Sequence, residues 1–386
     1  MSNNWIYKPL YETVELFDTF RKPINSKERA SRIIGKNKLE LYPYYGATGK
    51  VGLIDNYLIE GEYVLLGEDG APFLNPLAPK AYIISGKSWV NNHAHILRSK
   101  YNNKFLQYYL NCFDYRGYVS GTTRLKLTQA QMKQIPVPVP SLDEQERIVA
   151  RIEELFSQLD AGVETLKKTK AQLAVYRQAV LKEAFEGLTE KKPIREMSTL
   201  VTSGSRGWAQ YYADRGARFI RITDLTRDGI QLKNDSIQYV ALPDKAEGKR
   251  SRLLGGDVLV SITADLGSIA LIPGSIDEAY INQHIAMVRF KIPSQGEFMA
   301  WYLRSDCGQK DLLKNKRGGG KLGLGLDDIR DTPVPVVSDE AAQQTVAFID
   351  DRLSICDSIE QTVNTALQQA EAMRQGILKD AFEGRL

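Results

Sequence analysis

Apolar residues recur every seven positions between residues 142 and 186. These residues form a continuous apolar stripe, or seam, along a helix: Ile152, Leu159, Leu166, Leu173 and Val180. Large side chains also stand on the adjacent seam: Ile148, Leu155 and Tyr176. A strict seven-residue repeat predicts a long helix that packs against a partner helix as a coiled coil. Ser141 with Glu144 three residues later is typical of a helix start, and Gly187 is typical of a helix end.

The same stretch occurs twice, 197 residues apart. Residues 136–139 return at 333–336 as Pro-Val-Pro-Val, and residues 181–187 return at 378–384 with one change. Holding this offset over residues 121–187 gives 23 identities in 67 positions, which indicates an internal repeat. A second long helix is therefore predicted. Its interface takes smaller side chains at the equivalent positions: Ile349, Cys356, Val363, Ala370 and Ile377.

The simplest partner for the first helix is the second one, lying antiparallel, with the two halves related by an approximate two-fold axis. The proline-rich segment before each helix cannot be helical, because proline biases its predecessor toward extended geometry. We interpret each as a stiff hinge. The chain then divides into four parts: a globular unit at 1–140, a helix at 141–188, a second globular unit at 189–337 and a helix at 338–386.

Both globular units show short apolar or alternating runs bounded by glycine, which predict strands. In the first unit these runs lie at 50–54, 63–66, 82–85 and 95–97, and a short helix is predicted at 103–111. In the second unit they lie at 219–223, 257–263, 269–272 and 285–290. Residues 90–98 resemble residues 281–289 at an offset of 191. We predict a mixed α/β (α+β) fold of two similar globular domains joined by two long antiparallel coiled-coil helices with pseudo-two-fold symmetry.

Composition narrows the class of protein. Apolar residues make up 43% of the 386 residues and charged residues 25%, which is ordinary for a globular chain. No apolar run reaches the roughly 20 residues that span a bilayer, and the first residues lack a signal pattern, so we expect a cytoplasmic protein without a membrane partner. A net charge of +4 is too small to indicate nucleic acid without local clusters. Cys112, Cys307 and Cys356 lie far apart, and we interpret them as small buried hydrophobes.

The motifs do not supply a convincing catalytic or metal site. Residues 318–322 resemble the tail of a phosphate loop, but Leu322 stands where Ser or Thr would bind magnesium. The Asn-Pro-Leu at 75–77 lacks the second proline and aromatic residue with which adenine methyltransferases hold a flipped base. His93 and His95 would share a strand face, but no third ligand is near in sequence, so no metal is predicted.

Polar and basic residues indicate recognition instead. Three stretches concentrate cations that suit DNA phosphates or bases: Lys22, Lys27, Arg29 and Arg32; then Arg116, Arg124 and Lys126 with Tyr115 and Tyr118; then Lys314, Lys316, Arg317 and Lys321. Two further loops add candidates: Arg206 and Trp208 on a glycine-rich loop, a guanidinium and an aromatic ring that we expect to reach into a groove, together with Ser205, Arg250 and Arg252. A solvated charged face is the alternative for each cluster taken alone.

Two polar triplets stand just before predicted strands. They are Asn91, Asn92 and His93 in the first unit, and Asn282, Gln283 and His284 in the second. Amide side chains can make bidentate contacts with adenine, as Arg or Lys can with guanine. The alternative is that these side chains hydrogen-bond the backbone of their own loops, and the sequence leaves both possibilities open.

The segment at 136–149, which reads PVPVPSLDEQERIV, and the heptad helix ending AFEG at 184–187 closely resemble the DNA-specificity subunit of type I restriction-modification enzymes. The resemblance covers essentially the whole chain. It implies two target recognition domains, at 1–140 and 189–337, that each read half of a bipartite sequence in double-stranded DNA. The two long helices would fix the gap between the half-sites.

The resemblance also implies partners. Two DNA methyltransferase (modification) subunits, which bind S-adenosylmethionine and methylate adenine, would clamp the helices, and restriction/translocase subunits could join them. The chain itself would then hold no cofactor and catalyse no reaction. One departure is that residues 338–344 lose the Glu-Gln-Glu-Arg pattern of 144–147, so the second helix is expected to contact its partner differently.

Two other classes of function remain as alternatives. A coiled-coil adaptor would join two protein-binding modules and would not contact DNA. A stand-alone DNA methyltransferase or nuclease would show turnover by the purified chain with its cofactor, which we do not expect.

Overall fold

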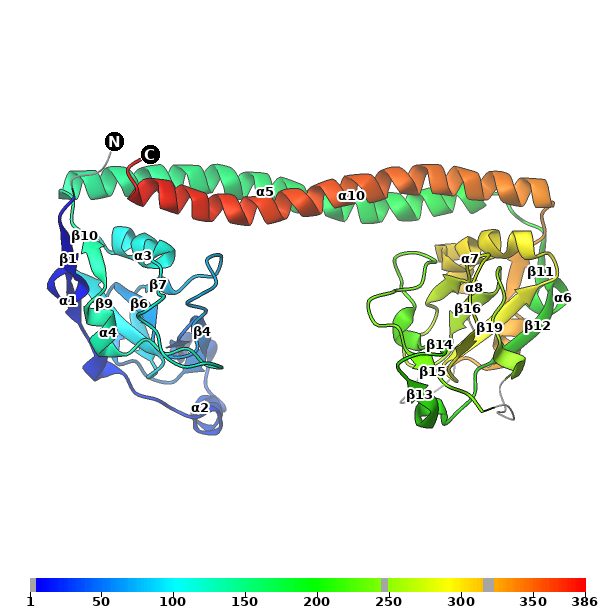
Figure 1. Cartoon of the computed structure of the whole chain (residues 1–386), viewed down its shortest axis with the longest axis horizontal. Coiled ribbons are helices and arrows are strands. Elements are labelled where there is room, and N and C mark those ends of the chain that lie inside the picture. The colour runs from blue at the N-terminus through cyan, green and yellow to red at the C-terminus, as the bar shows by residue number, and fades with distance from the viewer. Residues whose placement is uncertain (1–4, 244–248, 315–322) are drawn as a thin grey trace. The chain divides into compact units, whose positions relative to one another are not determined.

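A computed structural model describes residues 5–243, 249–314 and 323–386. The chain divides into two compact units (Figure 1). The first contains residues up to 167 together with 363–386, and the second contains residues 168–362. Each unit therefore includes a segment of both long helices. Within the described residues, no helix is both long and apolar enough to cross a membrane.

The first unit is built on two four-stranded sheets, and one helix, α3 (Asn103–Cys112), covers the antiparallel one. One sheet is antiparallel, in the order β2 (Val14–Leu16), β9 (Ala94–Ser99), β6 (Tyr63–Gly67) and β7 (Ala81–Ile84). The other runs in the order β4 (Gly49–Ile54), β3 (Tyr42–Gly46), β8 (Lys87–Val90) and β5 (Ile59–Glu60), with β3 and β8 parallel. Its helices are α1 (Leu10–Thr13), α2 (Ser26–Ile33), α3 (Asn103–Cys112) and α4 (Gln129–Lys133).

Strand β6 shows why its sequence is a continuous apolar run. Val64 and Leu66 point to one face, where they pack with residues of α3, and Leu65 points to the other face, where it packs with Val90 of β8. All three side chains are fully buried. Because the strand is covered on both faces, it needs apolar residues at every position rather than at alternate ones. The predicted strand at 63–66 is confirmed.

The second unit repeats the strand order of the antiparallel sheet and has a similar second sheet with one parallel pair. Its antiparallel sheet runs in the order β12 (Ser198–Ser203), β19 (Ile285–Phe290), β16 (Val258–Ser261) and β17 (Ile269–Leu271). Its other sheet runs in the order β13 (Tyr212–Ala213), β15 (Tyr239–Val240), β14 (Ala217–Ile220) and β18 (Ala279–Ile281), with β14 and β18 parallel. Helices α6 (Ile194–Met197), α7 (Gly296–Arg304), α8 (Asp306–Leu312) and α9 (Leu326–Arg330) complete it, and α7 takes the covering place of α3.

The proline-rich segments are strands, so their interpretation as hinges was wrong. β10 (Pro136–Pro138) pairs antiparallel with β1 (Tyr7–Pro9), and β20 (Pro333–Pro335) pairs antiparallel with β11 (Lys191–Pro193). The extended geometry that proline imposes also suits a short edge strand, where its missing N–H is tolerated. Each strand pair thus joins the first strand of a globular domain to the segment that leads into a long helix.

The two predicted long helices are confirmed as α5 (Leu142–Phe185) and α10 (Asp339–Phe382). In the first unit, Ile148 and Ile152 of α5 share a core with Leu378 and Phe382 of α10, and Arg374 forms an ion pair with Asp160. Residue numbers rise along α5 as those of its partner fall, so the pair is antiparallel. In the second unit Arg177 of α5 contacts Asp357 of α10 at 2.6 Å and Glu360 of α10 at 3.0 Å, which agrees with the same antiparallel arrangement.

The heptad positions lie along this helix pair. Seven of the predicted interface residues are buried, namely Ile152, Leu173, Val180, Ile349, Cys356, Val363 and Ala370. Three are half-buried, namely Leu159, Leu166 and Ile377. Tyr176 is 45% exposed and lies outside the interface, contrary to expectation.

The three cysteines differ in burial. Cys356 is buried, Cys112 is half-buried and Cys307 is exposed, so the interpretation of the cysteines as buried residues is wrong for Cys307.

Each long helix ends with a phenylalanine that packs onto a covering helix. Phe382 at the end of α10 lies 5.1 Å from Phe105 and 5.3 Å from Tyr109, both on α3. Phe185 at the end of α5 lies 5.5 Å from Phe298 and 5.4 Å from Tyr302, both on α7. The glycine two residues after each phenylalanine, at 187 and 384, has φ of +84° and +75°. This left-handed conformation stops the helix.

Candidate nucleic-acid interface

In the second unit, a glycine-rich loop after β12 crosses the loop between β18 and β19 at close range. Ser205 and Asn282 form a β-bridge between the two loops. A Cβ atom at Gly204 would lie 1.9 Å from the carbonyl oxygen of Ile281, so only glycine allows this approach. The crossing brings the predicted residues around 205 and 283 to one place on the unit.

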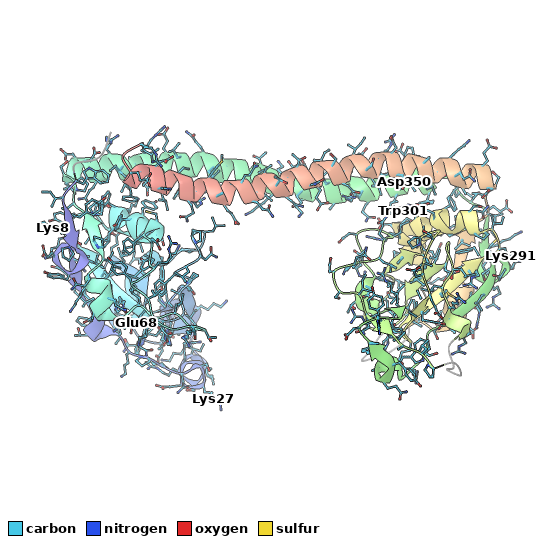
Figure 2. All side chains as sticks on the ribbon, in the orientation of Figure 1. Lys8, Lys27, Glu68, Lys291, Trp301 and Asp350 are labelled. Carbon is cyan, nitrogen blue, oxygen red and sulfur yellow. The ribbon has the colours of Figure 1, made fainter. Side chains whose placement is uncertain are left out.

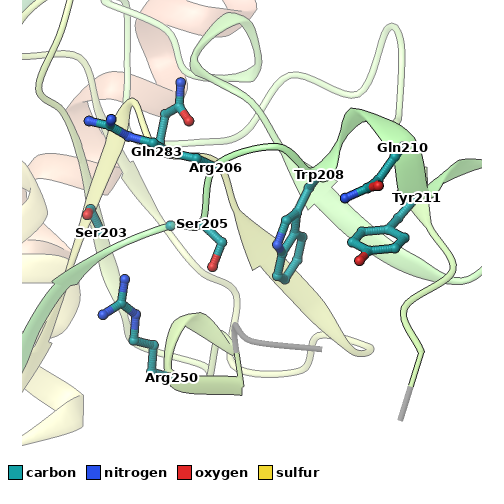
Figure 3. Close-up of a pocket in the computed structure, with 9 residues that line it drawn as sticks. Ser203, Ser205, Arg206, Trp208, Gln210, Tyr211, Arg250 and Gln283 are labelled. Carbon is teal, nitrogen blue, oxygen red and sulfur yellow. The ribbon is translucent and has the colours of Figure 1, made fainter. Parts of the chain in front are cut away.

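A pocket of about 420 Å³ opens beside this crossing. Figure 3 shows the side chains of its lining, which come from three separate segments. Arg206 comes from the glycine-rich loop, Arg250 from the 3-10 turn at Lys249–Ser251, and Gln283 from the turn before β19. Both arginines are exposed, and Gln283 is half-buried. Two guanidinium groups and an amide that line one polar pocket suit a ligand that carries both phosphates and base edges.

Trp208 does not reach outward, contrary to the prediction. It is only 5% exposed, its ring stacks on Phe219 with centroids 5.5 Å apart, and Tyr280 meets it edge-on at 5.3 Å. The tryptophan is the centre of a small core that supports the loop. Trp208 still lines the pocket, together with Gln210 and Tyr211, which follow it. Gln210 and Tyr211 were missed in the sequence, because their spacing carries no motif.

The asparagine that begins each polar triplet holds a turn. The Asn91 side-chain oxygen accepts a hydrogen bond from the backbone N–H of His93 at 2.8 Å, and Asn282 accepts one from His284 at 3.1 Å. The alternative of loop-backbone bonding therefore holds for these two asparagines. Asn92 is exposed at the middle of its triplet, where the second unit has Gln283.

The histidines of the two triplets have different neighbours. His284 Nδ1 lies 2.6 Å from the hydroxyl oxygen of Thr263 and its Nε2 lies 3.2 Å from the amide nitrogen of Gln283. His93 lies just before β9 rather than on it, with Nδ1 3.4 Å from a carboxylate oxygen of Asp69. His93 and His95 therefore do not share a strand face.

His95 is buried in a network of charged groups in the first unit. Its Nδ1 lies 2.7 Å from Asp18, and its Nε2 lies 3.1 Å from the carbonyl oxygen of Leu127. Burial alone would raise the pKa of Asp18, but the hydrogen bonds from His95 and from the backbone N–H of Ile96 outweigh it and lower that pKa. Within the described ranges, no group of three or more His, Cys, Asp or Glu side chains is arranged to hold a metal ion.

The second basic cluster lies on loops beside this network. Arg124 and Lys126 are exposed and form ion pairs with Asp69 at 2.7 Å and with Glu68 at 3.4 Å. Arg116 is exposed and pairs with Asp114 at 2.5 Å. Tyr118 is half-buried against Phe113, and Tyr115 is fully buried, so Tyr115 is a core residue. The cations remain accessible, and each already has a carboxylate partner.

The first basic cluster separates into two kinds of residue. Lys22 and Lys27 are exposed, and Figure 2 shows Lys27 on the outer part of α2. Arg29 instead lies over the ring of Tyr44 at 4.9 Å. Arg32 lies over the ring of Trp89 at 5.0 Å and pairs with Asp55 at 2.6 Å. The two arginines therefore hold α2 against the sheet.

Of the remaining candidates, Ser205 is half-buried at the loop crossing. Arg252 is exposed and lines a separate hollow with Glu278, away from the pocket. Lys314 is exposed after α8. Lys316, Arg317 and Lys321 lie outside the described residues.

Comparisons with known proteins identify the family of this chain. A model of the type I restriction modification DNA specificity domain matches residues 10–174 and 210–369. A putative type I restriction enzyme specificity subunit of Haemophilus influenzae is 37% identical over 151 residues, which are 39% of this chain and 37% of that protein. The EcoBI specificity subunit of Escherichia coli is 24% identical over 330 residues, which are 75% of this chain and 67% of that protein. The match to the Haemophilus protein thus spans little more than a third of its length.

Two solved structures share the fold. A chain in a structure of the type I R-M system superposes with a TM-score of 0.73 at 16% identity, covering 100% of this chain and 99% of that one. The HsdS subunit from Thermoanaerobacter tengcongensis gives 0.55 at 16% identity, covering 100% and 98%. These likenesses confirm the predicted fold class, and the matched domain model covers most of the sequence. The chain belongs to the type I restriction modification DNA specificity domain family.

Proposed function

We propose that this chain is the non-catalytic DNA-specificity component of a type I restriction-modification complex. Each unit reads one half of a bipartite target in double-stranded DNA. The observation that carries the proposal is the pocket of the second unit, where Arg206, Arg250 and Gln283 converge in a chain of this family. The phosphates would position the units, and loop side chains would read the base edges. The adaptor alternative gives no reason for two guanidinium groups beside an amide in an open polar pocket.

Replacing Arg206 or Arg250 with alanine is expected to weaken binding to any duplex. The slope of log affinity against log salt should fall by about one for each phosphate that the variant no longer binds. Fluorescence anisotropy over a salt series measures this slope. Lys291→Ala is the matched control (Figure 2). This exposed lysine comes directly after β19, at the opposite end of the strand from Gln283. Absence of any duplex binding by the wild type, even with modification subunits, would overturn the proposed function.

We also propose that modification subunits, which would carry the S-adenosylmethionine, dock on α5 and α10, and that restriction/translocase subunits join through them. Support comes from apolar side chains exposed on the helix pair of the second unit. Ile355 is 56% exposed and Ile359 is 41% exposed, and their spacing of four residues puts them on one helix face. Exposed apolar groups gathered on one face are typical of a protein–protein interface.

Changing both Ile355 and Ile359 to glutamate is expected to lower the affinity for the modification subunit about tenfold or more, because each isoleucine would lose the apolar burial that docking provides. Co-purification of tagged complexes and titration by light scattering measure the loss. Changing Ser354 and Ser358 together to glutamate adds the same two charges at the same four-residue spacing, at exposed positions that carry no apolar side chain, and serves as the control. An unchanged complex in the double variant would remove this face from the docking surface.

A further inference from the structure

We propose that Gln283 is the base-reading side chain of the second unit and that the base it reads is adenine. Asn92 is its equivalent in the first unit. The inference rests on the proposed function and assigns separate roles within the triplet of the second unit: Asn282 holds the turn, Gln283 reads the base, and His284 positions Gln283.

The turn presents the middle residue. In both triplets the first asparagine uses its side-chain oxygen to bind the backbone N–H of the histidine, at 2.8 Å in one unit and 3.1 Å in the other. That bond closes the turn and occupies the oxygen that would otherwise meet a base. The same geometry occurs in both compact units, so it belongs to the turn itself. The side chain of the middle residue takes no part in that bond.

Hydrogen bonding fixes the Gln283 amide. Its nitrogen can only donate, so His284 Nε2, at 3.2 Å, must accept. The imidazole proton then lies on Nδ1, which donates to the hydroxyl oxygen of Thr263 at 2.6 Å. Thr263 itself precedes Ala264, the one residue other than glycine with a left-handed φ (+62°) in the described part of the chain. Strain of this kind persists where the surroundings hold a loop in place.

The groups that remain on Gln283 select the base. Gln283 lines the pocket, and the contact with His284 uses only one N–H of its amide, which leaves the other N–H and the carbonyl oxygen for a ligand. This donor and acceptor match N7 and the amino group of adenine in the major groove. Guanine offers two acceptors at the same edge, so the carbonyl oxygen of Gln283 would face another oxygen. Arg206 and Arg250 line the same pocket and can bind the adjacent phosphates (Figure 3).

The test maps methylated adenines in genomic DNA from cells that produce the full chain with its modification subunits. Gln283→Ala is expected to relax one base position in one half-site, with discrimination falling about 10-fold to 100-fold. Gln283→Glu is expected to move the preference at that position from adenine to cytosine, because a carboxylate accepts from the cytosine amino group. Thr263→Val should weaken discrimination at the same position while overall affinity for duplex DNA is retained.

Gln231→Glu is the control, since it makes the same charge change at an exposed glutamine of the same unit outside the pocket lining. A wild type without any specific motif would overturn the proposed function and this inference together. A specific wild-type motif that Gln283→Ala leaves unchanged at every position would overturn this inference alone. Where Gln283→Glu methylates too little DNA to map, the alanine variant decides between the two results.

Discussion

Replacing Phe185 with alanine is expected to lower the free energy of unfolding of the second unit by about 3–5 kcal/mol. The ring is 5% exposed and packs edge-on against Phe298 and Tyr302 of α7, at 5.5 and 5.4 Å. It also belongs to the core that α7 shares with the sheet and with Ile349 of α10. Removing it leaves a cavity at the point where the long helix is fixed to the globular domain.

The repeat supplies a matched experiment. Phe382→Ala removes the equivalent ring, which packs on Phe105 and Tyr109 of α3 in the first unit. Hydrogen–deuterium exchange measured by peptide should therefore show faster exchange in α7 for Phe185→Ala and in α3 for Phe382→Ala. Val175→Ala, at a residue of α5 that is 71% exposed, is the control and should change stability by less than about 0.5 kcal/mol. A loss below about 1 kcal/mol in Phe185→Ala would mean that the helix end is held by other contacts.

The long helices could be predicted from the sequence because their signals are local. The heptad seam and the glycine at 187 place the end of the first helix within one residue of the observed Phe185. The strand at 285–290 was found with its observed bounds, since a strand covered on both faces is apolar at nearly every position, and here only Arg289 is polar. These features depend on neighbours in the chain.

Other features depend on distant partners, and the sequence could not supply them. The proline-rich segment becomes a strand only because Tyr7–Pro9, about 130 residues earlier, pairs with it. Trp208 looked like an outward aromatic in a glycine-rich loop, but Phe219 and Tyr280 cover it. A single sequence does not show which residues meet across that distance.

The candidate site divides in the same way. Arg206, Arg250 and Gln283 were all identified as polar residues on loops, yet their meeting at one pocket follows from the topology of two sheets and from the close approach at Gly204. Asn91 and Asn282 carry an amide, which is also the group that can read a base edge. Only the hydrogen bond to their own turn shows that they hold the loop. Composition alone could not separate these two roles.

Lengthening both long helices by one heptad is expected to abolish recognition of the original half-site spacing. The insertion duplicates residues 160–166 in α5 and 368–374 in α10, which lie opposite each other beside the Asp160–Arg374 ion pair, so the seam stays in phase. Seven residues add about 10 Å of helix, or about three base pairs of duplex. With the helices acting as the proposed ruler, the accepted spacer grows by about three base pairs, and both half-site sequences stay the same.

Three base pairs also turn the duplex by roughly a third of a helical turn, at about 10.5 base pairs per turn. The units must follow that rotation to engage both half-sites. Methylation at the original motif is therefore expected to be lost in either case. Where the units do follow the rotation, methylation is expected at a motif with the longer spacer. Mapping of methylated adenines reads both. The control inserts the same seven residues after Gly35, in an exposed loop of the first unit, and should leave the spacing unchanged. Retention of the original spacing by the lengthened chain would show that the helices do not set it.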